Sequence, residues 1–126
     1  MKQSKELDSA CIKRILKYIQ AIRGAYNTFN IESADDLAGN DICQLAITQA
    51  ITNIYQLQQK IQPETLVRLP IFQGLKLKGA RNIASHDYDS LDFDIIYKRT
   101  RQLLGRELFD ELESIKSDIE QPDKSN

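Results

Sequence analysis

The sequence predicts an all-α fold, an up-and-down bundle of four main helices with short helical segments. Apolar residues recur at intervals of three and four along most of the chain, the spacing of one helix face. Only three prolines and five glycines interrupt the 126 residues, and no stretch shows the alternation of a half-buried strand. At this length we expect one domain over residues 8–119, with a flexible N-terminus at 1–7 and a disordered polar tail at 120–126.

Two long helices are predicted in the first half of the chain. The first covers residues 9–26, and its apolar stripe contains Ile12, Ile15, Leu16, Ile19, Ile22 and Tyr26. Ser33 and Asp36 have the spacing of a capping box, so a short helix is expected there. After the break at Gly39, Asn40 or Asp41 can cap the second long helix. Its inner face is expected to contain Cys43, Ile47, Ala50, Ile54, Leu57 and Ile61, widened by Ala46 and Ile51.

The second half of the chain predicts one short and two longer helices. Pro63 opens a short helix over residues 64–69, and Pro70 closes it. The third main helix is expected from Phe72 to His86, followed by a turn at 87–90. Ser90 or Asp92 then caps the last long helix, in which Gly105 is expected to introduce a kink.

The composition excludes several classes of protein. No apolar run approaches the roughly 20 residues that span a bilayer, and the first residues lack the apolar centre of a signal peptide, so we expect a cytoplasmic protein without membrane contact. Cys11 and Cys43 fall on apolar helix faces, which is typical of buried thiols in a reducing compartment. With a single histidine and two separated cysteines, neither a metal site nor a cofactor is expected.

Charge is unevenly distributed along the chain, although the formal net charge is only −1. Residues 72–106 carry 7 basic and 4 acidic side chains (+3), whereas residues 107–126 carry 2 and 7 (−5). The positive segment is either a local phosphate-binding surface or a set of solvated helix faces. If it binds RNA, the candidate contacts are Lys76, Lys78, Arg99 and Arg101.

The single histidine, His86, is the strongest candidate for acid–base chemistry. Its imidazole titrates near neutral pH, and Arg81 on the same predicted helix offers a fork of donors suited to a phosphate. Together they suggest a phosphodiester substrate, with Asn82 and Tyr88 as neighbouring polar groups. Metal-free RNA cleavage needs both a base and an acid, yet the segment holds one imidazole. A symmetric homodimer would supply the second His86 and a second Arg81.

The segment Arg81-Asn82-x-x-x-His86 resembles the Arg-polar-x3-His motif of the HEPN superfamily, small all-α proteins that dimerise as metal-independent ribonucleases. The extended pattern Arg81-x4-His86-x-Tyr88 is similar to that of the HepT-like branch, as is the aspartate-rich segment 92–97. The resemblance covers residues 8–118. The chain departs from the family at Ala84 and Ser85, where many relatives have bulky aliphatic residues.

The resemblance implies a ribonuclease toxin of a toxin–antitoxin pair. It assigns Arg81 and His86 to catalysis, Asn82 to the polar position after the arginine, and Tyr88 to the tyrosine that is AMPylated in some members. The implied partner is a minimal (MNT-type) nucleotidyltransferase antitoxin. The alternative is a non-catalytic helical subunit that binds such a nucleotidyltransferase.

Overall fold

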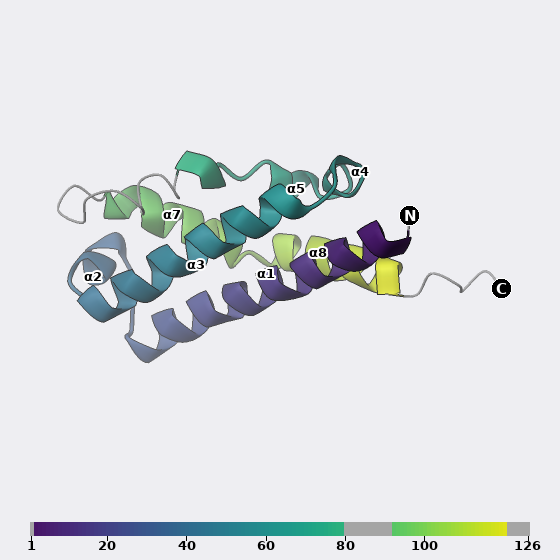
Figure 1. The fold of residues 1–126 in the computed structure, drawn as a ribbon. Coiled ribbons are helices and arrows are strands. Elements are labelled where there is room, and N and C mark those ends of the chain that lie inside the picture. Colours follow the sequence, from purple (N-terminus) through teal and green to yellow (C-terminus); the bar gives the residue numbers. More distant parts are fainter. Residues whose placement is uncertain (1, 80–91, 121–126) are drawn as a thin grey trace.

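The protein is described by a computed structural model over residues 2–79 and 92–120, and these residues are all-helical, with no strand among them. Residues 77–79 are also helical. The labelled helices in Figure 1 are α1 (Lys2–Thr28), α2 (Ala34–Ala38), α3 (Asp41–Lys60), α4 (Pro63–Leu66), α5 (Pro70–Gln73), α7 (Phe93–Leu103) and α8 (Arg106–Glu120). The predicted all-α class is confirmed for this part of the chain.

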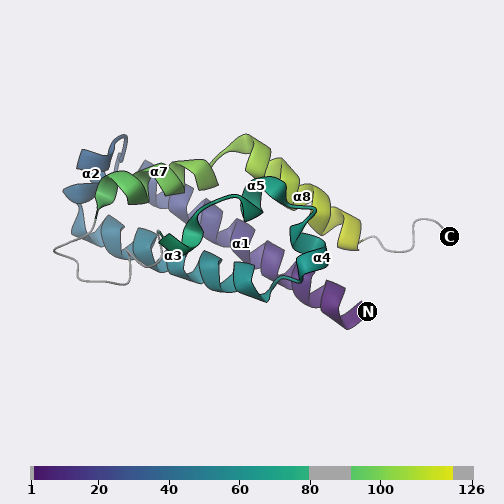
Figure 2. The ribbon, with the colours of Figure 1, turned by 90° about the horizontal axis from the view of Figure 1, so that it is seen from above.

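The two longest helices, α1 and α3, lie side by side and form the base on which the others pack. Helix α8 packs on α1 and α5, whereas α7 packs on α2 and α3 (Figures 1 and 2). The predicted stripe of α1 is confirmed, because all six of its residues are buried in the core. In α3, Leu57 is only partly buried and Ala46 is exposed, so its inner face is narrower than predicted. None of the described helices has both the length and the apolar character needed to cross a membrane.

Three helices begin where their sequences predict a cap. The Ser33 hydroxyl accepts from the Asp36 amide at 3.1 Å before α2, and the Asn40 side-chain oxygen accepts from the Cys43 amide at 2.9 Å before α3. The Asp92 carboxylate accepts from the amides of Asp94 and Ile95 at the start of α7. Each cap supplies an acceptor to an amide that has no partner within its own helix.

The predicted flexible N-terminus is helical, because α1 begins at Lys2 rather than near Ser9. Asp8 is almost fully buried, and its carboxyl group accepts from the backbone amide of Gln62 at 3.1 Å and from the Thr65 hydroxyl. These bonds attach the second turn of α1 to the α3–α4 connection and to α4. At the other end of the chain, α8 continues to Glu120, one residue into the predicted tail, and residues 121–126 lie outside the described part.

The predicted helix from Phe72 to His86 is interrupted after its first residues. Helix α5 ends at Gln73, residues 74–76 are not helical, and the chain becomes helical again at Leu77. The carboxylate of Glu111 in α8 accepts from the amides of Ile71 and Phe72, both at 2.9 Å, and so caps the first turn of α5. The predicted short helix 64–69 is also shorter, since α4 ends at Leu66.

Gly105 separates two helices, where the sequence predicts a kink in one. Helix α7 ends at Leu103, and the Arg23 guanidinium in α1 donates to the Leu104 carbonyl at 3.0 Å, satisfying an acceptor at the helix end.

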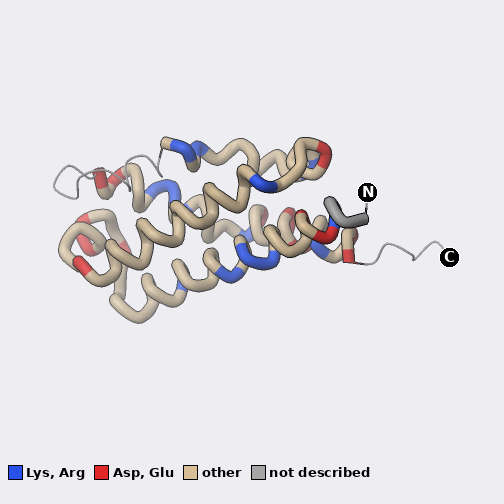
Figure 3. The backbone as a smooth tube through the Cα atoms, viewed as in Figure 1, with Lys and Arg blue, Asp and Glu red and all other residues tan. Residues whose placement is uncertain are grey.

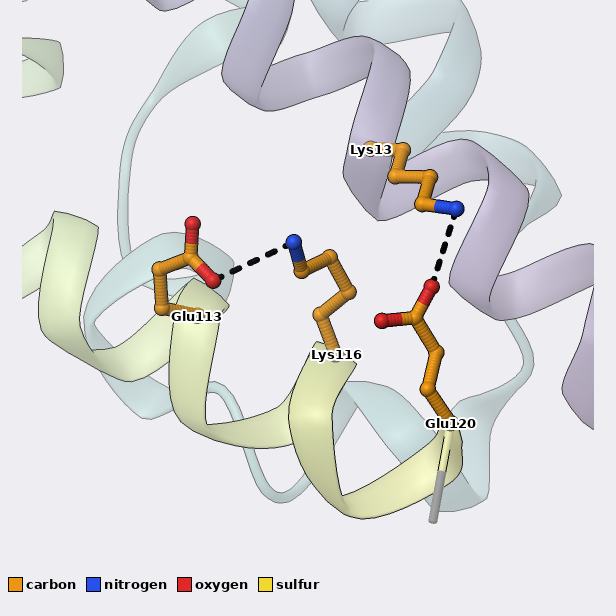
Figure 4. Close-up of polar contacts among 4 residues, drawn as sticks. All are labelled: Lys13, Glu113, Lys116 and Glu120. Carbon is orange, nitrogen blue, oxygen red and sulfur yellow. Dashed lines mark ion pairs between the residues drawn. The ribbon is translucent and has the colours of Figure 1, made fainter.

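In α8, the Glu120 carboxylate pairs with Lys13 of α1 at 2.9 Å, while Lys116 pairs with Glu113 (Figure 4). The hydrogen bond from Lys13 lowers the pKa of Glu120 below its usual range.

The buried hydroxyl of Tyr26 should ionise at a higher pH than a free tyrosine. Burial raises its pKa to about 12, although its hydrogen bond with Thr100 acts in the opposite direction. In the unfolded chain the phenol ionises near pH 10, so the folded state holds the extra proton between pH 10 and 12 and stability falls as pH rises through that interval. Tyr26→Phe should therefore remove a late titration step, near pH 12, from the absorbance at 295 nm. The same late step in the variant would contradict this assignment.

Candidate functional site

The four residues of the predicted catalytic segment, Arg81, Asn82, His86 and Tyr88, lie outside the described part of the structure, which resumes at Asp92. The structure describes the residues on both sides of that segment: residues 74–79 before it and Asp92 with α7 after it. The chain therefore enters residues 80–91 from the helical residues 77–79 and leaves them at Asp92, the cap of α7.

The chain before the segment is anchored in the core. Phe72 and Leu77 are at most 1% exposed, and the side-chain amide of Gln58 in α3 donates to the Phe72 carbonyl at 3.1 Å. Leu77 was not among the inner positions that the sequence predicts for the helix over residues 72–86, which are Phe72, Leu75, Ala80 and Ile83. Its neighbours Lys76 and Lys78 are both exposed, so two of the four predicted RNA contacts present their side chains to solvent directly before Arg81. The chain that leads into the predicted catalytic segment therefore carries two exposed positive charges.

The chain after the segment is anchored through α7. Its buried residues Ile96, Thr100 and Leu103 face the core, and the Thr100 hydroxyl shares a hydrogen bond with Tyr26 of α1. The ring of Tyr97 lies 5.6 Å from that of Tyr26, centroid to centroid, in a tilted arrangement. Pairs with this separation stabilise beyond the area that they bury. Helix α7 is therefore a fixed element next to the segment.

The other two predicted RNA contacts, Arg99 and Arg101, do not form a common surface. Residues two positions apart on a helix are separated by about 200° around its axis, so the side chains of Arg99 and Arg101 leave opposite sides of α7. Arg101 is exposed, whereas Arg99 is partly buried and donates to the Gln102 side chain at 3.2 Å. The Arg99 Nε atom is buried and has no hydrogen-bond partner among the described residues. At most one of the two arginine side chains can therefore lie on the same surface as Lys76 and Lys78.

A second group of cations, which the sequence did not single out, lies between α1 and α3. A groove of about 310 Å³ is lined by Arg14, Tyr18, Asn53, Gln56, Leu57 and Lys60, and we call it the basic groove. Lys17 and Arg14 also border an adjoining hollow of about 280 Å³. Within the described chain, the ion pairs involve other cations, namely Lys13, Arg68, Arg106 and Lys116. No local motif signals this groove, because it depends on how two helices are placed against each other.

The two cysteines offer no reactive thiolate. Cys11 and Cys43 are both buried and free, as their positions on apolar faces predict. Burial raises the pKa of each thiol, which keeps it protonated at neutral pH. In the part of the chain that the structure describes, no three His, Cys, Asp or Glu residues are grouped as metal ligands would be.

A comparison of the chain with protein-family models, with curated proteins and with solved structures found no match in any of the three.

Proposed function

We propose that this chain is a metal-independent endoribonuclease, the toxin of a toxin–antitoxin pair, built as a bundle of four main helices that acts as a homodimer. The observation that carries the proposal is the spacing Arg81-x4-His86-x-Tyr88 in a chain whose described residues are all-helical. The exposed Lys76 and Lys78 directly before Arg81 support it, because cations there would attract an RNA backbone. The Asp92 cap at the start of α7 agrees with the aspartate-rich segment of the HepT-like pattern.

The proposed reaction needs no group beyond the two subunits. One His86 takes the proton of a ribose 2′-hydroxyl, whose oxygen attacks the adjacent phosphorus, and the bond to the 5′-oxygen breaks. The His86 of the second subunit, protonated at the start, gives its proton to that leaving oxygen. The two Arg81 side chains offset the negative charge that develops on the phosphate. The products are a 2′,3′-cyclic phosphate and a 5′-hydroxyl end.

The proposed partner is an MNT-type nucleotidyltransferase that silences the toxin by AMPylating Tyr88. The hydroxyl of Tyr88 is two residues from His86, so a bulky, negatively charged AMP group there would repel the RNA phosphate. The same partner is also expected if the chain is a non-catalytic binding subunit, and the cleavage assay separates the two functions.

The decisive test is incubation of the purified protein with total cellular RNA in EDTA. We expect cleavage without added metal, and 3′ fragments that a kinase can label directly because they carry a free 5′-hydroxyl. A folded dimer that leaves the RNA intact would overturn the ribonuclease and favour the binding subunit. Cleavage that disappears in EDTA would contradict the proposed two-histidine reaction.

A further inference from the structure

Helix α3 carries no charged residue between Asp41 and Lys60, although 28% of the residues in the whole chain are charged. Its solvent-facing side contains the exposed residues Ile42, Leu45, Ala46, Gln49 and Gln56 and the partly buried Asn53, and we call this the outer face of α3. Ile42 and Leu45 are 67% and 55% exposed, because no described residue covers them. A helix that faces water normally presents charged residues there, so an uncharged outer face indicates a surface that another molecule covers.

The two ends of this outer face differ in shape and in charge. At the α2 end, Ile42 and Leu45 are exposed next to Asp41, and Asp35 and Asp36 of α2 are exposed as well. Figure 3 shows acidic residues gathered at this end of the molecule. At the opposite end the surface is hollowed by the basic groove, where Tyr18 and Leu57 supply apolar lining and Arg14 and Lys60 supply charge. One end is thus an exposed apolar and acidic surface, and the other is a recessed basic one.

These two ends fit each other in two copies of the chain. Ile42 and Gln56 are 14 residues apart, which is about 21 Å along α3 and only about 40° around its axis. A two-fold axis through the middle of the outer face would therefore place Ile42 of each copy against Gln56, at the basic groove of the other. The same rotation places each Asp41 beside a Lys60. Both contacts form twice, as a two-fold interface requires.

We propose that the outer face of α3 and the basic groove form the self-association surface of this protein, with the two α3 helices packed antiparallel. The middle of the face suits close packing, since Ala46 is small and the Gln49 side-chain amide already donates to Asn53 at 3.0 Å. Because these two side chains already hydrogen-bond to each other, a second copy that covers them leaves fewer polar atoms without a partner than it would over two unpaired amides. A surface about 30 Å long and two helices wide buries about 600 Å² per copy, which suits a weak, concentration-dependent dimer.

The proposed function needs a homodimer, and this surface would be the contact between its two subunits. In that respect the inference rests on the proposed function. It does not depend on RNA cleavage, because the contacts that define it lie in α1 and α3.

The first test compares two variants that add the same charge to equally exposed apolar positions. Ile42→Lys places a cation against Arg14 and Lys60 of the second copy, whereas Val67→Lys changes a residue that is 69% exposed at the end of α4, outside the proposed surface. In sedimentation equilibrium over a concentration series, we expect Ile42→Lys to raise the dimer Kd by about 100-fold, since two buried isoleucines are lost. The Val67→Lys protein should associate like the parent. Circular dichroism checks that both variants remain helical.

The second test exchanges the charges at the two ends of α3. Asp41→Lys and Lys60→Asp each place like charges together in an antiparallel homodimer, so each protein alone should be monomeric. An equimolar mixture of the two restores both opposite-charge contacts and should form heterodimers. A monomeric parent, an unaffected Ile42→Lys dimer or a mixture that stays monomeric would each overturn the proposed surface. RNA cleavage measured on the same samples reports separately on the ribonuclease.

Discussion

His86→Ala is expected to reduce metal-free RNA cleavage by at least about 100-fold, the smaller of the usual effects of losing a general acid or base. Both roles in the proposed reaction belong to the imidazoles of the two subunits, so a single substitution removes the base and the acid together. The measurement is the initial rate of cleavage of a defined RNA oligonucleotide in EDTA. Added imidazole should restore part of the lost rate, which a purely structural role of His86 would not allow.

Arg81→Ala should give a comparable loss, and Arg68→Ala provides its matched control. Arg68 is an exposed arginine that pairs with Asp118 of α8, outside the predicted catalytic segment. We expect the Arg68→Ala enzyme to cleave at the parental rate. Cleavage that survives His86→Ala unchanged, in protein of equal purity, would remove His86 from the reaction and leave the helical binding subunit as the better description.

Phe72→Ala is expected to lower the free energy of unfolding by about 3–5 kcal/mol, the usual cost of deleting a buried phenyl ring. The ring is fully buried, and the backbone of Phe72 is held from both sides, by Glu111 at its amide and by Gln58 at its carbonyl. These bonds limit how far the chain can move to fill the cavity, so the cost should lie toward the upper end. Urea unfolding followed by circular dichroism measures it.

The adjacent residue supplies the control for this prediction. Ile71 is 40% exposed and occupies the same helix, and its amide also donates to Glu111. Ile71→Ala should cost well under half as much, because it removes much less buried surface. Equal losses for the two variants would show that α5 contributes through its backbone bonds and that the Phe72 ring is not the anchor.

The sequence predicted the elements whose signals are local. The caps at Ser33, Asn40 and Asp92 each depend on an acceptor within three residues of the amide that it binds, and all three are confirmed. The stripe of α1 is equally local, because its spacing alone defines the buried face.

The errors arose where a distant residue decides the local structure. The separate turn of α5 begins at amides bound by the carboxylate of Glu111, which is about 40 residues further along the chain. The early start of α1 goes with contacts of Asp8 to the α3–α4 connection and to α4, 54 and 57 residues away. The basic groove exists only because α1 and α3 lie side by side. The chemistry of His86 and Arg81 could be read from spacing, and it stays a prediction.

The buried carboxyl group of Asp8 makes the Gln62 amide a reporter of the first turns of α1. That amide has its hydrogen-bond acceptor in another helix, so it can exchange with solvent deuterium only when α1 separates from the α3–α4 connection. Its exchange rate therefore measures an opening of the N-terminal turns, at a site far from them in sequence. Asp8→Asn retains one acceptor oxygen at the same position and should accelerate this exchange without melting α3, whereas the amides in the middle of α3 should keep the parental rate.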